Sequence, residues 1–295
     1  MFSRRDFGKI ALAAFPVARA MAAKIDSRFH GVRIGAQTYS FRDMGVDDAI
    51  NAMKQIGIGE CELFMGHVEP KDLKGAALTR WRLETPLDYF QGIRKKFDDA
   101  GIKIYAYCLN FRDDFSDAEL DRGFEMTKAL GTNVITTSTT LTCARRLAPL
   151  AAKHQVKVAM HGHDAVDKPN EFSTPESFQK ALEMSPQFYI NLDIGHFYAA
   201  GYDPVSYIEQ HHDKILVIHV KDRKRDQVVD GKVKPFTGAN LPFGEGDTPI
   251  KQVLVLLRDK KYNILADIEY EYGKEGVDTV ANVRKCFEYC KQALA

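Results

Sequence analysis

The stretch NLDIGH (residues 191–196) ends an apolar segment on two polar side chains, Asp193 and His196. The preceding residues 188–190 are Phe, Tyr and Ile, as expected of a strand that is buried on both faces. Polar groups at the end of a buried strand indicate that a functional site lies there.

Eight segments of the chain are predicted to be strands, because they are rich in Val, Ile and Tyr. They are residues 33–41, 60–64, 103–111, 133–139, 156–163, 189–196, 215–221 and 263–270. Helical patterns separate them, with Gly57 and Gly101 placed to end two helices and Ser116 with Glu119 forming a capping box. Proline at a first helical position is expected at three further helices, in 174–178, 203–208 and 248–257.

Eight alternating strands and helices in about 270 residues predict an α/β protein with a (β/α)8 TIM barrel. A doubly wound open sheet is the main alternative, but no G-x-G-x-x-G follows any of these strands. No linker divides the chain, so residues 23–295 are predicted to form one domain. Two long connections, 65–85 and 223–247, would lie over the carboxyl ends of the strands, where barrel enzymes build their active sites.

The N-terminal 22 residues have the pattern of an export signal. Basic residues 4, 5 and 9 precede the short apolar run 10–18 and an A-x-A site. Arg4 and Arg5 resemble the twin-arginine signal, which exports folded proteins. The sequence thus predicts a periplasmic or secreted protein that is not stably anchored in the membrane.

Removing the signal takes away four basic residues and one acidic residue, so the formal net charge changes from +1 to −2. A nucleic-acid-binding protein is normally basic, so no nucleic-acid partner is expected. Among the five cysteines, Cys286 and Cys290 lie one helical turn apart and are interpreted as packing residues. A homo-oligomer is compatible with these features.

Four successive strands end on metal-ligating side chains. The residues are His161, Asp193, His219 and Glu269. Because strand ends converge in a barrel, we expect these side chains to face one centre and to bind a divalent metal. The imidazoles favour Mn²⁺ or Zn²⁺ over Mg²⁺, and Co²⁺ is also compatible.

The ordered segments LDIGH, IHVKD, FGEGD and IEY resemble the xylose-isomerase-like barrel superfamily, which includes sugar phosphate isomerases and epimerases, over nearly the whole mature chain. The resemblance implies a metal held by a Glu, an Asp, a His and a Glu. The last three correspond to Asp193, His219 and Glu269, whereas the first falls on His161. This departure counts against a simple 3-epimerase, because relatives of that kind use both glutamates to move protons.

The resemblance implies an isomerase or epimerase that removes a proton next to the carbonyl of a keto-sugar. A lyase or hydratase acting on a 3-keto-glycoside by the same chemistry is the alternative. A nuclease of the apurinic-endonuclease branch and a sugar-binding protein without turnover are the remaining alternatives. The proton-transfer candidates are Glu269, His163 and Lys221.

Five residues are predicted to contact the sugar substrate. They are His196, Glu62, Gln37, Tyr39 and Glu245. His196 is alternatively a partner that orients Asp193, and Glu245 is expected mainly to fix the long loop. The charged segment 223–226 is interpreted as a solvated loop.

Overall fold

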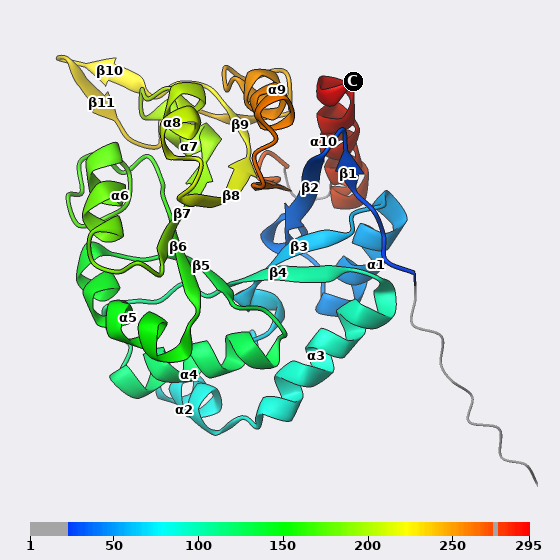
Figure 1. Cartoon of the computed structure of the whole chain (residues 1–295), viewed down its shortest axis with the longest axis vertical. Coiled ribbons are helices and arrows are strands. Elements are labelled where there is room, and N and C mark those ends of the chain that lie inside the picture. The colour runs from blue at the N-terminus through cyan, green and yellow to red at the C-terminus, as the bar shows by residue number, and fades with distance from the viewer. Residues whose placement is uncertain (1–22, 274–276) are drawn as a thin grey trace, which may run out of the picture.

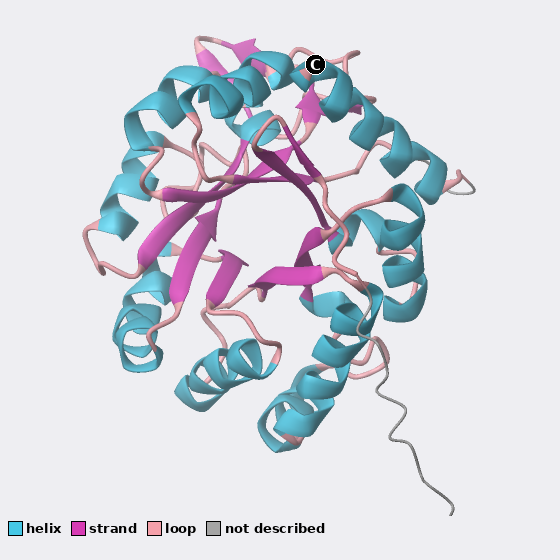
Figure 2. Cartoon of the chain, turned by 45° about the vertical axis from the view of Figure 1, so that its right-hand side comes forward, coloured by secondary structure: helices cyan, strands magenta, loops and turns pink. Residues whose placement is uncertain are grey.

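The computed structural model describes residues 23–273 and 277–295, so the predicted signal, residues 1–22, lies outside the described residues. Eight parallel strands form a closed ring, in the order β2–β13–β8–β7–β6–β5–β4–β3, and β2 closes it by pairing with β3. Helices surround the ring (Figure 2). The barrel strands are β2 (Val32–Gln37), β3 (Glu60–Phe64), β4 (Lys103–Cys108), β5 (Val134–Ser138), β6 (Lys157–His161), β7 (Phe188–Asp193), β8 (Ile215–Val220) and β13 (Leu265–Ile268).

The α-helices outside the ring follow the strands in chain order (Figure 1). They are α1 (Val46–Ile56), α2 (Gly75–Glu84), α3 (Leu87–Ala100), α4 (Asp117–Ala129), α5 (Leu141–His154), α6 (Pro175–Leu182), α7 (Ile194–Ala199), α8 (Pro204–His211), α9 (Ile250–Lys260) and α10 (Thr279–Leu294). Two 3₁₀ turns, η1 (Thr38–Phe41) and η2 (Met65–His67), follow β2 and β3. Within the described residues no helix is both long and apolar enough to cross a membrane.

The predicted helix ends agree closely with the structure. Gly57 and Gly101 end α1 and α3 with positive φ angles of 97° and 75°, a conformation that glycine adopts without strain. Ser116 and Glu119 form the capping box of α4. Pro175 and Pro204 begin α6 and α8, but Pro249 is the residue before α9 and not its first residue.

The predicted barrel and all eight strands are present, but several strands end earlier than predicted. The segment 189–196 is extended only as far as Asp193, because the Asp193 Oδ1 accepts a hydrogen bond from the His196 N–H at 2.8 Å and begins α7. Similarly, the Gln37 side chain accepts the Tyr39 N–H at 3.0 Å, and η1 replaces the predicted end of the first strand. These two strands therefore end where a polar side chain caps the next turn.

The two long connections contain secondary structure of their own. The first holds η2 and α2, and the second holds four short strands. These are β9 (Asp222–Arg223), β10 (Gln227–Val229), β11 (Lys232–Lys234) and β12 (Asn240–Leu241). A short strand β1 (Arg28–Phe29) pairs antiparallel with β2. The β10–β11 hairpin projects from the edge of the molecule near α8 (Figure 1).

The strand register places the polar residues at matching heights. Asp193 of β7 pairs with His219 of β8, and His161 of β6 pairs with Asn191. Residues two apart on a strand face the same side of a sheet, so Asn191 and Asp193 lie on one face.

In the described part of the chain all five cysteines are free and buried, and Cys286 and Cys290 pack in α10 as predicted.

Candidate metal centre

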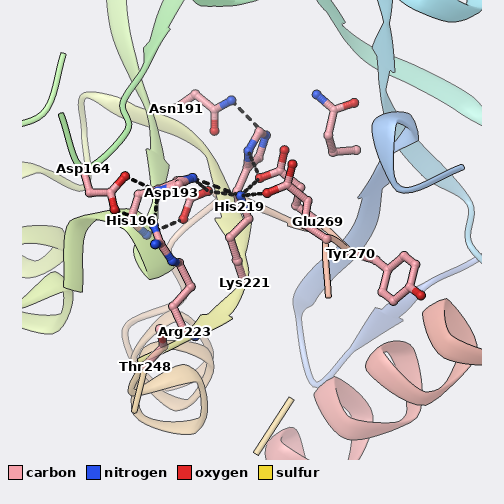
Figure 3. A network of polar contacts seen from close by, with 12 residues as sticks. Asp164, Asn191, Asp193, His196, His219, Lys221, Arg223, Thr248, Glu269 and Tyr270 are labelled. Atoms are coloured by element: carbon pink, nitrogen blue, oxygen red, sulfur yellow. Dashed lines mark hydrogen bonds and ion pairs between the residues drawn. The ribbon is translucent and has the colours of Figure 1, made fainter. Parts of the chain in front are cut away.

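Four side chains from separate strands meet at the carboxyl end of the barrel. His161 and Asp193 are the last residues of β6 and β7, His219 lies in β8, and Glu269 directly follows β13. One potential ligand atom from each lies within 4.8 Å of the other three, and all four residues are buried. The structure thus brings together the four residues predicted as metal ligands, and Figure 3 shows three of them, Asp193, His219 and Glu269, converging from their strands.

The donor set suits a divalent cation. Two imidazoles and two carboxylates offer the nitrogen and oxygen ligands of Mn²⁺ or Zn²⁺. Within residues 23–273 and 277–295, His161 Nδ1 is buried without a hydrogen-bond partner, whereas Asp193 Oδ2 is paired with Lys221 Nζ at 3.1 Å. Buried polar atoms are normally paired. The unpaired His161 nitrogen therefore fits a cation held by the four residues.

His219 is oriented by a carboxylate on each side of its ring. Its Nε2 lies 3.0 Å from Glu62 Oε2, and its Nδ1 lies 3.1 Å from Glu269 Oε2. Burial alone would lower the pKa of His219, but Glu62 and Glu269 raise it well above the usual value. The same field that holds a proton on this ring stabilises a cation beside it.

Glu62 lies beneath the cluster, fully buried at the end of the barrel interior. Its carboxylate contacts Gln37 Nε2 at 2.5 Å, Asn191 Nδ2 at 3.2 Å and His219 Nε2 at 3.0 Å. Both oxygens are thus used by protein groups. Glu62 lies where it can position His219. Gln37 lies where it can position Glu62, and it also lines the cavity next to the cluster.

Lys221 lies among the carboxylates of the site. Its Nζ lies 3.1 Å from Asp193 Oδ2, 2.8 Å from Glu269 Oε2 and 2.7 Å from Glu271 Oε2. Burial would lower the pKa of Lys221, but Asp193 and the two glutamates raise it well above its ordinary value. Burial would likewise raise the pKa of Glu269, which Lys221 and His219 hold well below the usual range. The Lys221 ammonium and the Glu269 carboxylate are therefore both charged at neutral pH.

Two further histidines lie on the β6 and β7 side of the cluster. His196 Nε2 lies 3.2 Å from Lys221 Nζ, and Asp164 Oδ1 lies 2.9 Å from its Nδ1, so a proton on Nδ1 leaves Nε2 free to accept. Burial is the main reason that the pKa of His163 is lowered to about 4, and the nearby His196 and Lys221 lower it further. His163 is therefore neutral at pH 7 and able to accept a proton.

The GEG segment stabilises the loop after β8 through its backbone. The Gly244 and Gly246 N–H groups donate to Asp222 Oδ2 at 2.7 and 3.0 Å. A Cβ at Gly246 would overlap the Asp222 carboxylate, so this close approach requires glycine. The Glu245 side chain is exposed and is not among the residues that line the cavities next to the metal cluster.

The cluster opens into a cavity of about 690 Å³ over the ends of β3, β4 and β5. Tyr39, half-buried against the edge of Phe64 at 5.0 Å between ring centres, forms one wall. Asn110, Ser138 and Thr139 add hydrogen-bonding groups, and Asp113, Asp114 and Glu171 line it as well. A cavity of this size with both aromatic and hydrogen-bonding groups in its wall is suited to a small hydroxylated molecule.

The interpretation of residues 223–226 as a solvated loop is wrong at both of its ends. Arg223 and Asp226 are buried, while Lys224 and Arg225 are exposed. Arg223 donates to Asp164 Oδ2 at 2.8 Å and to the Gly238 carbonyl at 2.7 Å. The charge pattern alone gives no signal for this burial, because the partners lie in distant segments.

Two buried residues of the site, Asn191 and Asp267, were not predicted from the sequence. Asn191 precedes Asp193 by two residues and contacts both Glu62 and His219. Asp267 precedes Glu269 by two, and neither of its oxygens has a hydrogen-bond partner among the described groups. Alternation along the strand, applied backward from each expected ligand, would have placed both side chains in the barrel interior.

Comparisons with known proteins agree with this architecture. Over 159 residues the chain is 26% identical to the inosose dehydratase of Clostridium tetani (strain Massachusetts / E88), a match that spans 51% of this chain and about half, 52%, of that relative. Two solved structures have the same fold. A sugar phosphate isomerase/epimerase from Parabacteroides distasonis has a TM-score of 0.62 at 17% identity and covers 90% of this chain and 95% of its own.

The second structure is described as the probable 3-DHS dehydratase AsbF, involved in petrobactin synthesis, from Bacillus anthracis. It has a TM-score of 0.62 at 16% identity and covers 89% of this chain and 97% of its own. The family model of the xylose isomerase-like TIM barrel matches residues 50–292, which is most of the chain. Together with the closed ring of eight parallel strands, this match shows that the chain belongs to the xylose isomerase-like TIM barrel family.

Proposed function

We propose that this protein is a metal-dependent carbohydrate enzyme that removes a proton next to the carbonyl of a keto-sugar. The observation that carries the proposal is the convergence of His161, Asp193, His219 and Glu269 on one buried point that opens into a cavity with polar and aromatic walls. These four residues would hold a divalent cation. A cation bound there supplies Lewis-acid polarisation of a substrate carbonyl.

The chain's own residues supply the proton transfers. Lys221 is protonated at neutral pH and lies next to Glu269, so it can donate a hydrogen bond to a substrate oxygen that gains negative charge. His163 lines the cavity, and its lowered pKa leaves it neutral and able to accept a proton. Glu271 lies 2.7 Å from Lys221, lines the same cavity and is outside the ligand cluster, which makes it a further candidate base.

A lyase reaction is the form of this chemistry that we favour. His161 stands where relatives with two proton-transferring glutamates have a carboxylate, so the symmetric proton exchange of a 3-epimerase lacks one of its two bases. The likeness to a dehydratase of Clostridium tetani supports elimination as the outcome. In such a reaction the α-proton leaves to a base, a carbon–carbon double bond forms, and the oxygen substituent on the neighbouring carbon leaves with a proton from an acid.

Isomerisation is the second candidate, because the same loss of the α-proton followed by its return at another carbon moves the carbonyl. The same fold occurs in a sugar phosphate isomerase/epimerase, so the barrel accommodates both outcomes. The export signal predicted at residues 1–22 leads us to propose that the reaction occurs in the periplasm or outside the cell.

One experiment tests the proposal and separates its two forms. The protein is purified with Mn²⁺ and incubated in D2O with 3-keto-glucosides and with free ketoses, and the sugars are followed by NMR. We expect deuterium at the carbon next to the carbonyl, or loss of the aglycone without net oxidation. Release of the aglycone identifies the lyase, and a new ketose or aldose identifies the isomerase. If metal-loaded protein leaves every sugar unlabelled, the proposal fails.

A further inference from the structure

The metal cluster opens into a second cavity, distinct from the first. This second cavity has a volume of about 370 Å³ and lies toward the loop that carries β9 to β12. His161, His163, Glu269 and Glu271 line both cavities, so the two meet at the cluster. Each volume falls within the range of about 300–1,000 Å³ that is typical of a complete ligand site. One sugar ring bound at the cluster would leave one of these cavities free.

An aromatic side chain forms the outer wall of the second cavity. Phe236 lines it with 55% of its surface exposed, and its ring centre lies 6.4 Å from that of His196. Its φ angle is +62°, a left-handed conformation that is rare for a bulky residue. Such a conformation persists only where surrounding contacts impose it, and it often marks a functional position.

Hydrogen bonds to two buried carboxylates, Asp164 and Asp226, impose this conformation on Phe236. Its N–H donates to Asp164 Oδ2 at 3.0 Å, and the N–H groups of Thr237 and Gly238 donate to Asp226 Oδ1 at 3.0 and 2.8 Å. Asp164 also contacts His196 and Arg223, so one buried carboxylate fixes both the site histidine and the loop. These bonds fix the backbone from which the aromatic ring extends over the cavity.

The remaining lining favours an uncharged hydroxylated group. Lys221 and Arg223 line the cavity, but each is already paired with buried carboxylates, so neither cation is free for an anion. Asn240 also lines it, and its side-chain oxygen has no hydrogen-bond partner among the described residues. An aromatic face beside an amide side chain suits a sugar ring, which presents both C–H groups and hydroxyls.

We infer that the second cavity is a subsite for a second uncharged ring, which makes the substrate a glycoside and not a free monosaccharide. This inference rests on the proposed function for the placement of the reacting ring. That ring lies in the larger cavity, which also reaches His219 and Gln37, and its glycosidic partner stacks on Phe236. The wall is formed by the loop after β8, so the choice of partner ring depends on that loop.

The test compares two substrates in the full-length protein loaded with Mn²⁺. For Phe236→Ala, kcat/KM toward 3-keto-cellobiose is expected to fall by about tenfold, which corresponds to roughly 1.4 kcal/mol. The value toward 3-keto-glucose, which lacks the second ring, is expected to stay unchanged. Phe236→Tyr keeps the ring and should retain the preference for the disaccharide. Val228→Ala, a change at an exposed apolar residue of the same loop, is the matched control.

A binding measurement separates failure of this inference from failure of the proposed reaction. Saturation-transfer NMR with unoxidised cellobiose needs no turnover, and Phe236→Ala should reduce the signal of the non-reacting ring relative to wild type. If no keto-sugar reacts but this loss is seen, the subsite stands and the proposed reaction fails. The inference is overturned if Phe236→Ala affects both substrates equally or neither, or changes only the oligomeric state measured by light scattering.

Discussion

At the scale of single residues, the two ring nitrogens of His219 have different roles. Glu269 lies at Nδ1, on the side of the metal cluster, and Glu62 lies at Nε2, on the side of the barrel interior. A proton on Nε2 donated to Glu62 leaves Nδ1 as the ligand atom. Carboxylates that orient a metal-binding histidine in this way typically contribute about 10- to 100-fold to metal affinity.

Glu62→Gln is therefore expected to weaken Mn²⁺ binding by about 10- to 100-fold while the ligands themselves are intact. The physical reason is the loss of the negative charge that fixes the His219 tautomer and supports the cation. Competition with a metal-binding dye measures the affinity directly, without an activity assay. Glu60→Gln is the matched control, because Glu60 lies on the same strand but pairs with Arg33. Equal affinities for the two variants would contradict the assigned role of Glu62.

The lowered pKa of His163 predicts a pH-dependent loss of stability. Burial holds this pKa at about 4 in the folded protein, against about 6.5 in an unfolded chain. Between these values the unfolded state binds the extra proton, so the contribution of His163 to folding is lost as the pH falls from about 6.5 toward 4. The difference of roughly 2.5 pKa units corresponds to at most about 3 kcal/mol.

In the presence of EDTA, the free energy of unfolding of His163→Gln should therefore fall less steeply over this pH range than that of the wild type. Urea denaturation at a series of pH values measures it. The control is His212→Gln, a change at the exposed residue that directly follows α8, and this variant should follow the wild-type curve. Parallel curves for wild type and His163→Gln would show that the ring is not held neutral by burial.

At the scale of secondary-structure elements, the barrel interior depends on close packing between strands. A Cβ on Gly35 in β2 would overlap Asp267 Oδ1 of β13. It would also lie 2.9 Å from the carbonyl oxygen of Glu60, the first residue of β3. Backbone and a buried side chain both limit the space there. The glycine thus lets β2 approach its two neighbours while Asp267 points into the barrel.

Gly35→Ala is accordingly expected to destabilise the protein by about 1–3 kcal/mol, the usual cost of overpacking a core. The same change at Gly92, an exposed position in α3 with no described atom within 4 Å of the added Cβ, should stabilise the helix by roughly 0.5–1 kcal/mol. Chemical denaturation of both variants measures the contrast. If Gly35→Ala were as stable as the wild type, the interior would have to be looser than the structure shows.

At the scale of the whole molecule, the ring of strands gathers residues that are more than 100 positions apart in sequence. His161, Asp193, His219 and Glu269 come from four different βα units, so a cation bound among them links four parts of the barrel. A ligand that binds the folded state alone stabilises it in proportion to the logarithm of its concentration. Metal binding should therefore be visible in thermal unfolding.

Adding Mn²⁺ at about 100 times its dissociation constant should stabilise the chelator-treated protein by roughly 2.7 kcal/mol and raise its Tm. His161→Ala should lose most of this shift, because it removes one ligand without disturbing a helix cap. Asp193 is less suitable for this purpose, since it also caps α7. Differential scanning calorimetry measures the shift. Identical Tm values with and without Mn²⁺, Zn²⁺, Mg²⁺ and Co²⁺ would contradict the proposed metal centre.

The sequence by itself determined the strands, their order and the residues that end them, because apolar runs, helix caps and turn residues are local signals. The four expected ligands, with His163, His196 and Lys221, could be named for the same reason: each lies at or just beyond a strand end. Two strands were predicted to be too long, at the points where Asp193 and Gln37 cap the following turns. An extended residue and a capping residue look alike in sequence.

Only the tertiary structure decided which groups meet across the ring. The partners of Glu62, the burial of Arg223 and Asp226, and the placement of Phe236 over a second cavity all depend on contacts between residues far apart in the chain. No local pattern encodes such contacts, because the free energy of burying a charge depends on which partner the fold brings to it. The sequence therefore located the site, and the closed barrel determined its internal arrangement.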